Sequence, residues 1–477
     1  MAFVLILMPL VMAALAAAVP SNRLRPWLLP LTAAMHLAGV VFTISRPDLT
    51  ASTAWLVLDP PARLILAMVS TLFFLCSFYA VGYLRCRPER SNRVFCACLL
   101  AFLGTMSLVT WSHHLGLMWV AIEATALLTA PLIYFNRTQR SIEATWKYLL
   151  VSSVGVALAM LGTFFLAYAS LHGGVESSLT LEELLREAPR LSKPWLHAAF
   201  VLLLVGYGTK MGLAPMHTWK PDAYGEAPGV VGAVFAGGVT SCAFLALLRV
   251  YHIVWTAGEA AYASRLLLLM GLLSMAVAGL FMVGQRDFKR MLAYSSVEHM
   301  GILALGLGIG GPALWGTLLH VVTNGLTKGV LFLSAGNIHR AYASKSTDRV
   351  SGAMQRLPLS GAMFLAGFLA ITGSPPFGLF VSEFAILNGA FDAGRFIIAG
   401  LFLVLLLVVF IGMGATVLRV VQGPVPDEAR STPYRDGLLT AAPVMALMLF
   451  ALGLGLFIPA PLDDLLHEAV RFLEGRP

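Results

Sequence analysis

The chain has 477 residues, of which 58% are hydrophobic and only 12% are charged. Its repeated apolar runs of about twenty residues match the length that an α-helix needs to cross a bilayer. This composition excludes a soluble enzyme and predicts an all-α, polytopic membrane protein whose first partner is the lipid bilayer. The net charge of +8 lies mostly in short loops, so it indicates membrane topology and not a nucleic-acid partner.

In chain order, the apolar runs predict about fourteen spanning segments of the length that a bilayer requires. They lie near residues 2–19, 27–44, 62–84, 93–111, 113–135, 146–171, 195–224, 229–253, 264–284, 291–310, 313–335, 357–391, 396–421 and 437–459. The first run lacks a small-residue cleavage site, so we expect a retained helix. The five cysteines lack paired CxxC spacing, and no metal site is expected.

Lysine and arginine gather in alternate loops of this predicted topology, for example at 85–93 and 286–290. The loops between them are poor in basic residues or acidic, as at 175–190. Cytoplasmic loops of membrane proteins carry the excess of positive charge. We therefore expect a multi-pass protein of the bacterial inner membrane with both termini in the periplasm.

The segment 195–224 combines a lysine with helix-breaking residues. Lys210 is followed by Gly212 and Pro215, so the segment buries an ionisable group beside freed backbone carbonyls. The lysine lies about 22 Å from the start of the run at 1.5 Å per residue, which is a long way to snorkel to a headgroup. A kinked helix with a snorkelling lysine is the alternative, and an ion path is the interpretation we favour.

A second segment, 357–391, is interrupted at Pro375, Pro376 and Gly378 and carries Glu383 beyond the break. It crosses the predicted membrane in the opposite direction to the first. Paired interrupted helices of opposite direction indicate inverted repeats with a transport site where the breaks meet, although Gly and Pro also occur in membrane helices without function. The predicted organisation is three N-terminal helices at 1–92, repeats at 93–253 and 264–421, and a last spanning helix with a C-terminal tail at 437–477.

The remaining ionisable residues inside apolar runs form a short series. Glu123 has no basic neighbour within a helical turn, and a lone carboxylate there is costly, so we expect it to pair with Lys210. His320 and Lys328 lie about two helical turns apart with Asn324 between them. We interpret them as a relay, while a satisfied interior histidine and a lysine held by a carbonyl are the structural alternatives.

Two interpretations apply to polar residues near the predicted cytoplasmic side. Lys289 fits a positive-inside loop as well as a proton path, and Glu143 and Lys147 fit a simple i,i+4 ion pair. Four further residues are expected to admit protons or to cap and gate the inner end of the first broken helix: His217, Asp222, Glu298 and His299.

Four stretches resemble, in order and spacing, the antiporter-like membrane subunits of respiratory complex I and of Mrp cation/proton antiporters. They are GYGTKMGLAPMHTWKPDAYGEAP, QRDFKRMLAYSSVEHMG, HVVTNGLTKGVLFLSAGNI and GSPPFGLFVSEF. A fifth stretch, WVAIEATALLTAPLIYF, is most similar to the F-type subunit of hydrogenase-4 and formate hydrogenlyase complexes. The resemblance implies about fourteen helices, two inverted five-helix repeats and a hydrated polar axis at mid-membrane.

The same resemblance implies roles for individual residues of that axis. Glu123 matches the helix-5 carboxylate that pairs with Lys210, the broken-helix lysine. Lys328 matches the central relay lysine, and Glu383 matches the terminal residue beside the second break. Two further residues match family positions: His320 and Lys289.

Two departures from the family pattern affect this expected relay. Ser241 occupies a place in the eighth helix where many relatives carry a lysine, and Asn324 stands where some have histidine. The serine leaves a gap between Lys210 and Lys328 that water would have to bridge.

The resemblance implies a proton-translocating subunit of a redox-driven complex, of hydrogenase-4/formate hydrogenlyase type or of complex I-like NADH:quinone oxidoreductase type. No motif for nucleotide, flavin, quinone or metal is present, so we expect no cofactor and no catalytic residue in this chain. The electron chemistry then belongs to partners, which are other membrane subunits and a peripheral redox arm. A sodium/proton antiporter subunit of Mrp type and a passive membrane anchor are the alternatives.

Overall fold

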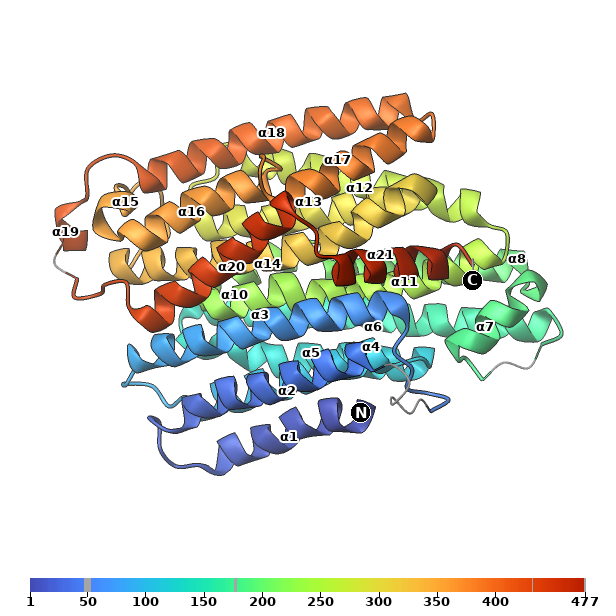
Figure 1. The fold of residues 1–477 in the computed structure, drawn as a ribbon, viewed down its shortest axis with the longest axis horizontal. Coiled ribbons are helices and arrows are strands. Elements are labelled where there is room, and N and C mark those ends of the chain that lie inside the picture. The colour runs from blue at the N-terminus through green and yellow to red at the C-terminus, as the bar shows by residue number, and fades with distance from the viewer. Residues whose placement is uncertain (47–52, 176–177, 431, 476–477) are drawn as a thin grey trace.

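The fold is a bundle of long helices that run side by side (Figure 1). The computed structural model describes residues 1–46, 53–175, 178–430 and 432–475. Within this part of the chain, eleven helical segments are long and apolar enough to cross a membrane, and Ala2–Ala18 and Pro358–Ile371 are shorter apolar helices. The predicted all-α membrane fold is confirmed.

Each predicted spanning segment coincides with one helix or with consecutive helices. Their bounds are α1 (Ala2–Ala18), α2 (Leu28–Ser45), α3 (Pro60–Arg85), α4 (Arg93–Trp111), α5 (Leu115–Ile133), α6 (Gln139–His172), α8 (Lys193–Met211), α9 (Trp219–Glu226), α10 (Gly229–Val234), α11 (Thr240–Thr256), α12 (Ala260–Met282), α13 (Phe288–Ile309), α14 (Leu314–Tyr342), α16 (Pro358–Ile371), α17 (Gly378–Asp392), α18 (Phe396–Val421) and α20 (Leu438–Leu456). Shorter helices lie between or after them: α7 (Leu181–Glu187), α15 (Ala353–Arg356), α19 (Asp427–Arg430) and α21 (Ala460–Leu473).

Several of the loops that the sequence predicts to be basic meet at one end of the bundle. Arg87 donates to the Asn136 side chain at 2.8 Å, and Asn136 donates to the carbonyl oxygen of Glu226 at 3.0 Å. Glu226 in turn pairs with Lys345 at 2.6 Å. Both chain ends lie away from α15 and α19, toward the other end of the bundle (Figure 1). The two termini therefore share one side, as the alternation of loops predicts.

The first broken helix consists of α8 and α9. α8 ends at Met211, where Gly212 adopts a φ of 79° that favours glycine over residues with a side chain. α9 begins at Trp219. Pro215 lies in the connection, where its missing N–H removes no helical hydrogen bond. The predicted interruption at Gly212 and Pro215 is confirmed.

The second broken helix consists of α16 and α17, and it runs in the opposite direction. α16 begins at the end that holds α15 and α17 ends at the other side (Figure 1), whereas α9 ends with Glu226 at the basic-loop end. Pro375 and Pro376 lie in the connection, and Gly378 is the first residue of α17. This break also falls where the sequence predicts it.

Two central segments are buried on all sides. They are α14, which packs against α10, α13, α16, α17 and α20, and the segment Gly229–Thr256 formed by α10 and α11. A π-helical turn, Phe235–Val239, joins α10 to α11. Such turns often mark functional positions in helices, and the apolar pattern of the sequence does not predict it.

A buried ion pair fixes the N-terminal helices to α11. Arg249 Nε lies 2.8 Å from Asp59 Oδ2, and both side chains are 2% exposed. The guanidinium also donates to the carbonyl oxygens of Val109, Thr110 and Ser112. Because a buried charge is tolerated only when it is paired and hydrogen-bonded, this arrangement explains how an arginine stands inside an apolar helix.

The tail predicted after the last spanning helix forms an additional helix, α21. It packs against α3 and α14, where Glu468 pairs with Arg63 at 2.8 Å and Asp463 accepts a hydrogen bond from Trp315 Nε1 at 3.1 Å. Residues 476–477 of the predicted segment lie outside the described residues. The predicted first repeat ends at 253 inside α11, and the second begins at 264 inside α12, whereas the boundaries at 93, 421 and 437 lie at or next to helix ends. The division into repeats itself stays a prediction.

Candidate functional site

Buried ionisable side chains are concentrated on the helices that carry the two breaks and on the helices packed against them. They come from α5, α8, α9, α13, α14 and α17: Glu123, Lys210, Lys220, Glu298, His299, His320, Lys328 and Glu383. Among these eight, Glu123 is partly exposed and the others are buried. Ionisable side chains inside membranes are costly and usually functional. This set, the polar row, is therefore the candidate site.

Lys210 begins the row near the end of α8. Its Nζ lies 5.3 Å from the centroid of the Tyr148 ring, which gives the ammonium a cation–π contact. The Glu123 carboxylate acts on it electrostatically, but no ion pair within 4.0 Å joins them in the part of the chain that is described. Glu123 instead accepts a hydrogen bond from Ser153 Oγ at 3.4 Å. The predicted pair is thus coupled through space and not in contact.

Lys220, on α9, is a buried lysine that the sequence analysis did not single out. Its Nζ donates to the carbonyl oxygen of Met211 at the end of α8 and to Ser296 Oγ at 3.1 Å. The side chain has no exposed area. Its position ten residues after Lys210, within the same motif, is the feature of the sequence that could have identified it. Because it follows the break, however, a cytoplasmic position was expected.

Lys328, on α14, is held from the neighbouring helix α13. Its Nζ donates to Ser295 Oγ at 2.7 Å, and the Glu298 carboxylate acts on it electrostatically. The structural alternative of a lysine held only by a carbonyl does not apply. Glu298 was expected to line an entry channel, and the structure places it in the interior near Lys328, one turn of α13 away from Ser295.

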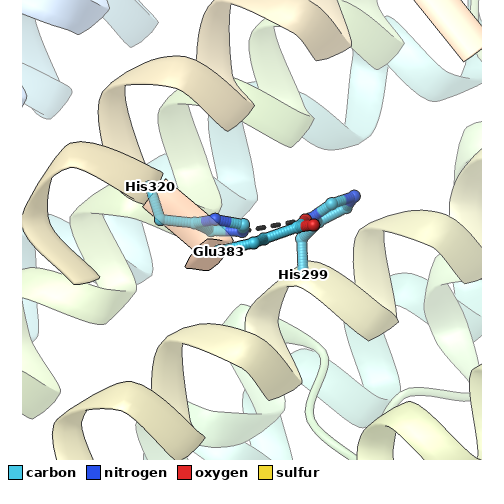
Figure 2. A group of neighbouring side chains, drawn as sticks. All are labelled: His299, His320 and Glu383. Carbon is cyan, nitrogen blue, oxygen red and sulfur yellow. Dashed lines mark hydrogen bonds between the residues drawn. The ribbon is translucent and has the colours of Figure 1, made fainter. Parts of the chain in front are cut away.

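His299, His320 and Glu383 form a compact cluster (Figure 2). His299 Nδ1 and His320 Nε2 share a hydrogen bond of 3.0 Å, and His320 Nδ1 shares another of 3.0 Å with Ser382 Oγ. The Glu383 carboxylate lies against Gly373 in the second break, where a Cβ would stand 3.1 Å from its Cδ. The structure thus brings His320 and Glu383 together with His299, and the relay and entry roles expected for these residues stay predictions.

The same cluster has the donor chemistry of a transition-metal site, which the cysteine pattern alone does not predict. One ligand atom from each of His299, His320 and Glu383 lies within 4.8 Å of the others. Two observations weigh against a bound metal ion. The two imidazoles already use facing nitrogens for one hydrogen bond, and the Lys328 ammonium acts on both rings, which opposes a second cation.

Several polar atoms of the row and of the neighbouring Asn324 have no hydrogen-bond partner among the described residues. They are Lys210 Nζ, Glu298 Oε1, His299 Nε2, Glu383 Oε1 and both polar side-chain atoms of Asn324. Buried polar atoms are nearly always hydrogen-bonded, either to protein or to ordered water. Internal water would supply the missing partners of these atoms, and such water can conduct protons between them.

The basic-loop end of the bundle contains a charged cavity of about 890 Å³ lined by Asp222, Glu226 and Lys345 among other residues. Asp222 pairs with Lys147 at 3.1 Å, and Lys147 also makes the expected i,i+4 pair with Glu143 at 2.6 Å. Asp222 thus lies where a gating residue would meet water.

Two further predicted residues are buried beside the two ends of α9. Lys289 is 1% exposed, and its Nζ donates to the carbonyl oxygens of Gly225 and Ala227 at 3.0 and 2.5 Å, so it holds the end of α9 instead of lying in a solvated loop. His217 is buried in the connection before α9, with its ring 6.2 Å from that of Tyr294. The roles of both in a proton path stay predictions.

Comparisons with known proteins agree with this geometry. Residues 112–409 match the family described as NADH:quinone oxidoreductase/Mrp antiporter, TM. The hydrogenase-4 component F homolog of Methylacidiphilum infernorum is 33% identical over 465 residues, which cover 95% of this chain and 96% of that protein. The chain belongs to this antiporter family. The four motifs that carry the resemblance lie within the matched residues, so the family expected from them is confirmed.

Other antiporter-family members are similar over most of their length. NADH-quinone oxidoreductase subunit 14 of Thermus thermophilus is 36% identical over 375 residues, which cover 76% of this chain and 78% of that protein. A chain of respiratory complex I from the same organism has a TM-score of 0.79 at 27% identity, with 96% of this chain and 97% of that chain covered. A chain of the Mrp complex from Dietzia sp. has a TM-score of 0.86 at 22% identity, covering 99% and 97%, which shows the shared fold. These solved chains are parts of multi-subunit membrane complexes.

Proposed function

We propose that this chain is the proton-translocating, antiporter-like subunit of a redox-driven membrane complex of hydrogenase-4/formate hydrogenlyase or complex I type. The observation that carries the proposal is the polar row, in which seven of the eight ionisable side chains are buried. The 33% identity to a hydrogenase-4 component F homolog over nearly the whole chain supports the type of complex. A passive anchor has no need for so many costly groups in its interior.

The mechanism follows from electrostatic coupling between neighbouring groups. The negative charge of Glu123 stabilises the Lys210 ammonium. The attraction between opposite charges a few ångströms apart amounts to several kcal/mol inside a protein. When the partner complex withdraws that charge, the Lys210 ammonium loses its counter-charge and releases a proton along the row. Lys328, in its neutral amine form, and the His299–His320 cluster then receive it, because a neutral amine takes up a proton and an imidazole both accepts and donates one.

Sodium/proton exchange of Mrp type is the second candidate function. The chain is 26% identical over 411 residues to a Na(+)/H(+) antiporter component of Bacillus subtilis. Transporters coordinate sodium with the carbonyls of unwound helix ends. Here the carbonyl oxygen of Met211 at the end of α8 is taken by Lys220 Nζ, and the row consists mostly of amines and imidazoles, which suit protons better than a hard cation.

We further propose that the chain needs no cofactor of its own and that electrons pass through a peripheral redox arm. Other membrane subunits would flank it, as in the complexes whose chains share its fold. The basic-loop end would face the cytoplasm of a bacterial inner membrane and both termini the periplasm, because positive loops stay inside.

The test is purification of the tagged chain in mild detergent, followed by identification of co-eluting subunits and reconstitution into vesicles. We expect hydrogenase or dehydrogenase subunits to co-elute and donor oxidation to drive proton uptake at the same rate in sodium-free choline buffer. Co-elution with antiporter subunits alone, or transport that requires sodium, would contradict the proposal and support the Mrp-type function.

A further inference from the structure

Lys220 lies between the first broken helix and α13, because its side chain contacts residues of both. It stands on α9, directly after the first break, and its side chain folds back over Gly212, where a Cβ would come within 2.9 Å of its Nζ. Its ammonium lies 5.7 Å from the centroid of the Tyr224 ring. Glycine at position 212 therefore has two functions in the break: it permits the positive φ, and its missing side chain leaves room for Lys220.

A purely structural role is the first interpretation to weigh. Lysines near a helix C-terminus hydrogen-bond the last carbonyls and interact favourably with the helix dipole, and Lys220 does bond the Met211 carbonyl at the end of α8. An ammonium has three donors, however. Two more contacts, to Ser296 Oγ at 3.1 Å and to the Ser296 carbonyl oxygen at 3.3 Å, reach a different helix and are not needed for the cap.

Adjacent serines on α13 connect this lysine to the central one. Lys220 bonds Ser296 and Lys328 bonds Ser295 at 2.7 Å, so the two ammonium groups meet consecutive hydroxyls of one helix. The charges of the two lysines also act on one another. Two ammonium ions this deep in a low dielectric repel strongly, so a proton on one disfavours a proton on the other.

The second break repeats the arrangement with an acid in place of the base. Glu383, on the helix after that break, folds back over Gly373, which has a φ of 65°. Side chains on helices point toward the N-terminus of their helix, which is why a residue shortly after each break reaches its glycine. At each of the two breaks, therefore, one ionisable side chain packs against a glycine with a positive φ.

We propose that Lys220 is the middle proton carrier of the row, filling from α9 the gap that Ser241 leaves on α11. This inference rests on the proposed function. One proton leaves Lys220 Nζ and one arrives at Lys328 Nζ, while each serine hydroxyl accepts one proton as it gives up another, with internal water joining the hydroxyls. Ser241 itself is 1% exposed, and its Oγ has no partner among the described residues.

Three variants of the reconstituted complex test the inference, with proton uptake and electron transfer measured together. Lys220→Met removes the carrier, and Lys220→Arg keeps donors and charge but cannot release a proton. Both should lower the rate of redox-driven proton uptake by about a hundredfold, the scale on which positioned proton-transfer groups act. Lys220→Met combined with Ser241→Lys should recover a substantial part of the pumping, because it returns a lysine to the gap from the other helix.

The control Lys328→Met separates this inference from the proposed function. If Lys328→Met stops pumping while Lys220→Arg pumps like the wild type, Lys220 is a helix cap and the inference alone is wrong. If Lys328→Met also pumps normally, the proposed function itself fails. Should Lys220→Met not assemble, Lys220→Arg decides: loss of pumping in an assembled complex supports the carrier role, and normal pumping overturns it.

Discussion

Glu123 and Glu143 are carboxylates on neighbouring helices that differ in their surroundings. Glu123 Oε2 is buried without a partner among the described residues, whereas the Glu143 side chain is 61% exposed and pairs with Lys147. Exposed ion pairs contribute only about 0–1 kcal/mol. We expect Glu123→Gln to lower redox-driven proton uptake by about tenfold, the effect of roughly 1.4 kcal/mol, and Glu143→Gln to change it less than about twofold.

Equal losses of uptake in the two variants would count against electrostatic coupling between Glu123 and Lys210. Electron-transfer rates measured in the same vesicles show whether a loss comes from the proton path or from assembly. The substitution is chemically the same in both positions, so each variant serves as the matched control of the other.

Ionisable residues within apolar runs are the part of the site that the sequence could predict. Lys210, His320, Lys328 and Glu383 are conspicuous there because charge is so rarely tolerated in a membrane. Their contacts could not be predicted, because which side chains meet depends on the packing of α13 against α14 and not on periodicity within one helix. Lys220 was missed because a lysine after a break fits an ordinary cytoplasmic loop equally well.

At the scale of elements, the second broken helix yields a prediction about Glu383. Its carboxylate sits between the break and the two histidines, where it can take a proton from His320. Glu383→Gln should block proton translocation, since an amide cannot carry the proton. Glu383→Asp shortens the reach by about 1.5 Å and should retain partial translocation. The measurement is protons moved per electron in reconstituted complex.

A Gln variant that pumps with unchanged stoichiometry would make Glu383 a structural carboxylate and send the proton out by another route. The Asp variant controls for general disturbance of α17, because it keeps the acid while altering the packing more than Gln does.

Glycine and proline made both broken helices predictable, since they remove hydrogen bonds or permit a positive φ. Two other elements had no such signal. The π-helical turn Phe235–Val239 inserts into an uninterrupted apolar run, and α21 follows Pro459 in a stretch too polar to span a membrane. α21 is stabilised by tertiary contacts such as Arg63 with Glu468, which a local pattern does not contain.

On the scale of the whole molecule, the Arg249–Asp59 pair joins the N-terminal helices to the first predicted repeat. Arg249→Met leaves Asp59 buried without its partner, and breaking a buried pair costs about 3–5 kcal/mol. Arg63→Met removes a partly exposed pair with Glu468 and should cost about 0–1 kcal/mol. Thermal unfolding of the two variants in detergent, followed by circular dichroism, measures the difference. Equal midpoints would show that the buried pair does not hold the bundle together.

The overall arrangement was predictable because the positive-inside rule and the bilayer length act on every segment at once. Those two rules do not predict contacts between distant segments, such as the hydrogen bonds of Arg249 to the carbonyls at the end of α4. The same holds for the charged cavity at the basic-loop end, whose walls come from four separate stretches of the chain.

The most direct test of proton translocation through the polar row is Lys210→Met in the intact reconstituted complex. Lys210 Nζ is fully buried and has no hydrogen-bond partner among the described residues, so its removal relieves a burial cost and should leave assembly intact. Lys193→Met, at an exposed lysine paired with Glu259, is the matched control. The account predicts assembled complex with proton uptake lost in Lys210→Met and normal in Lys193→Met. Wild-type protons per electron in Lys210→Met would contradict it.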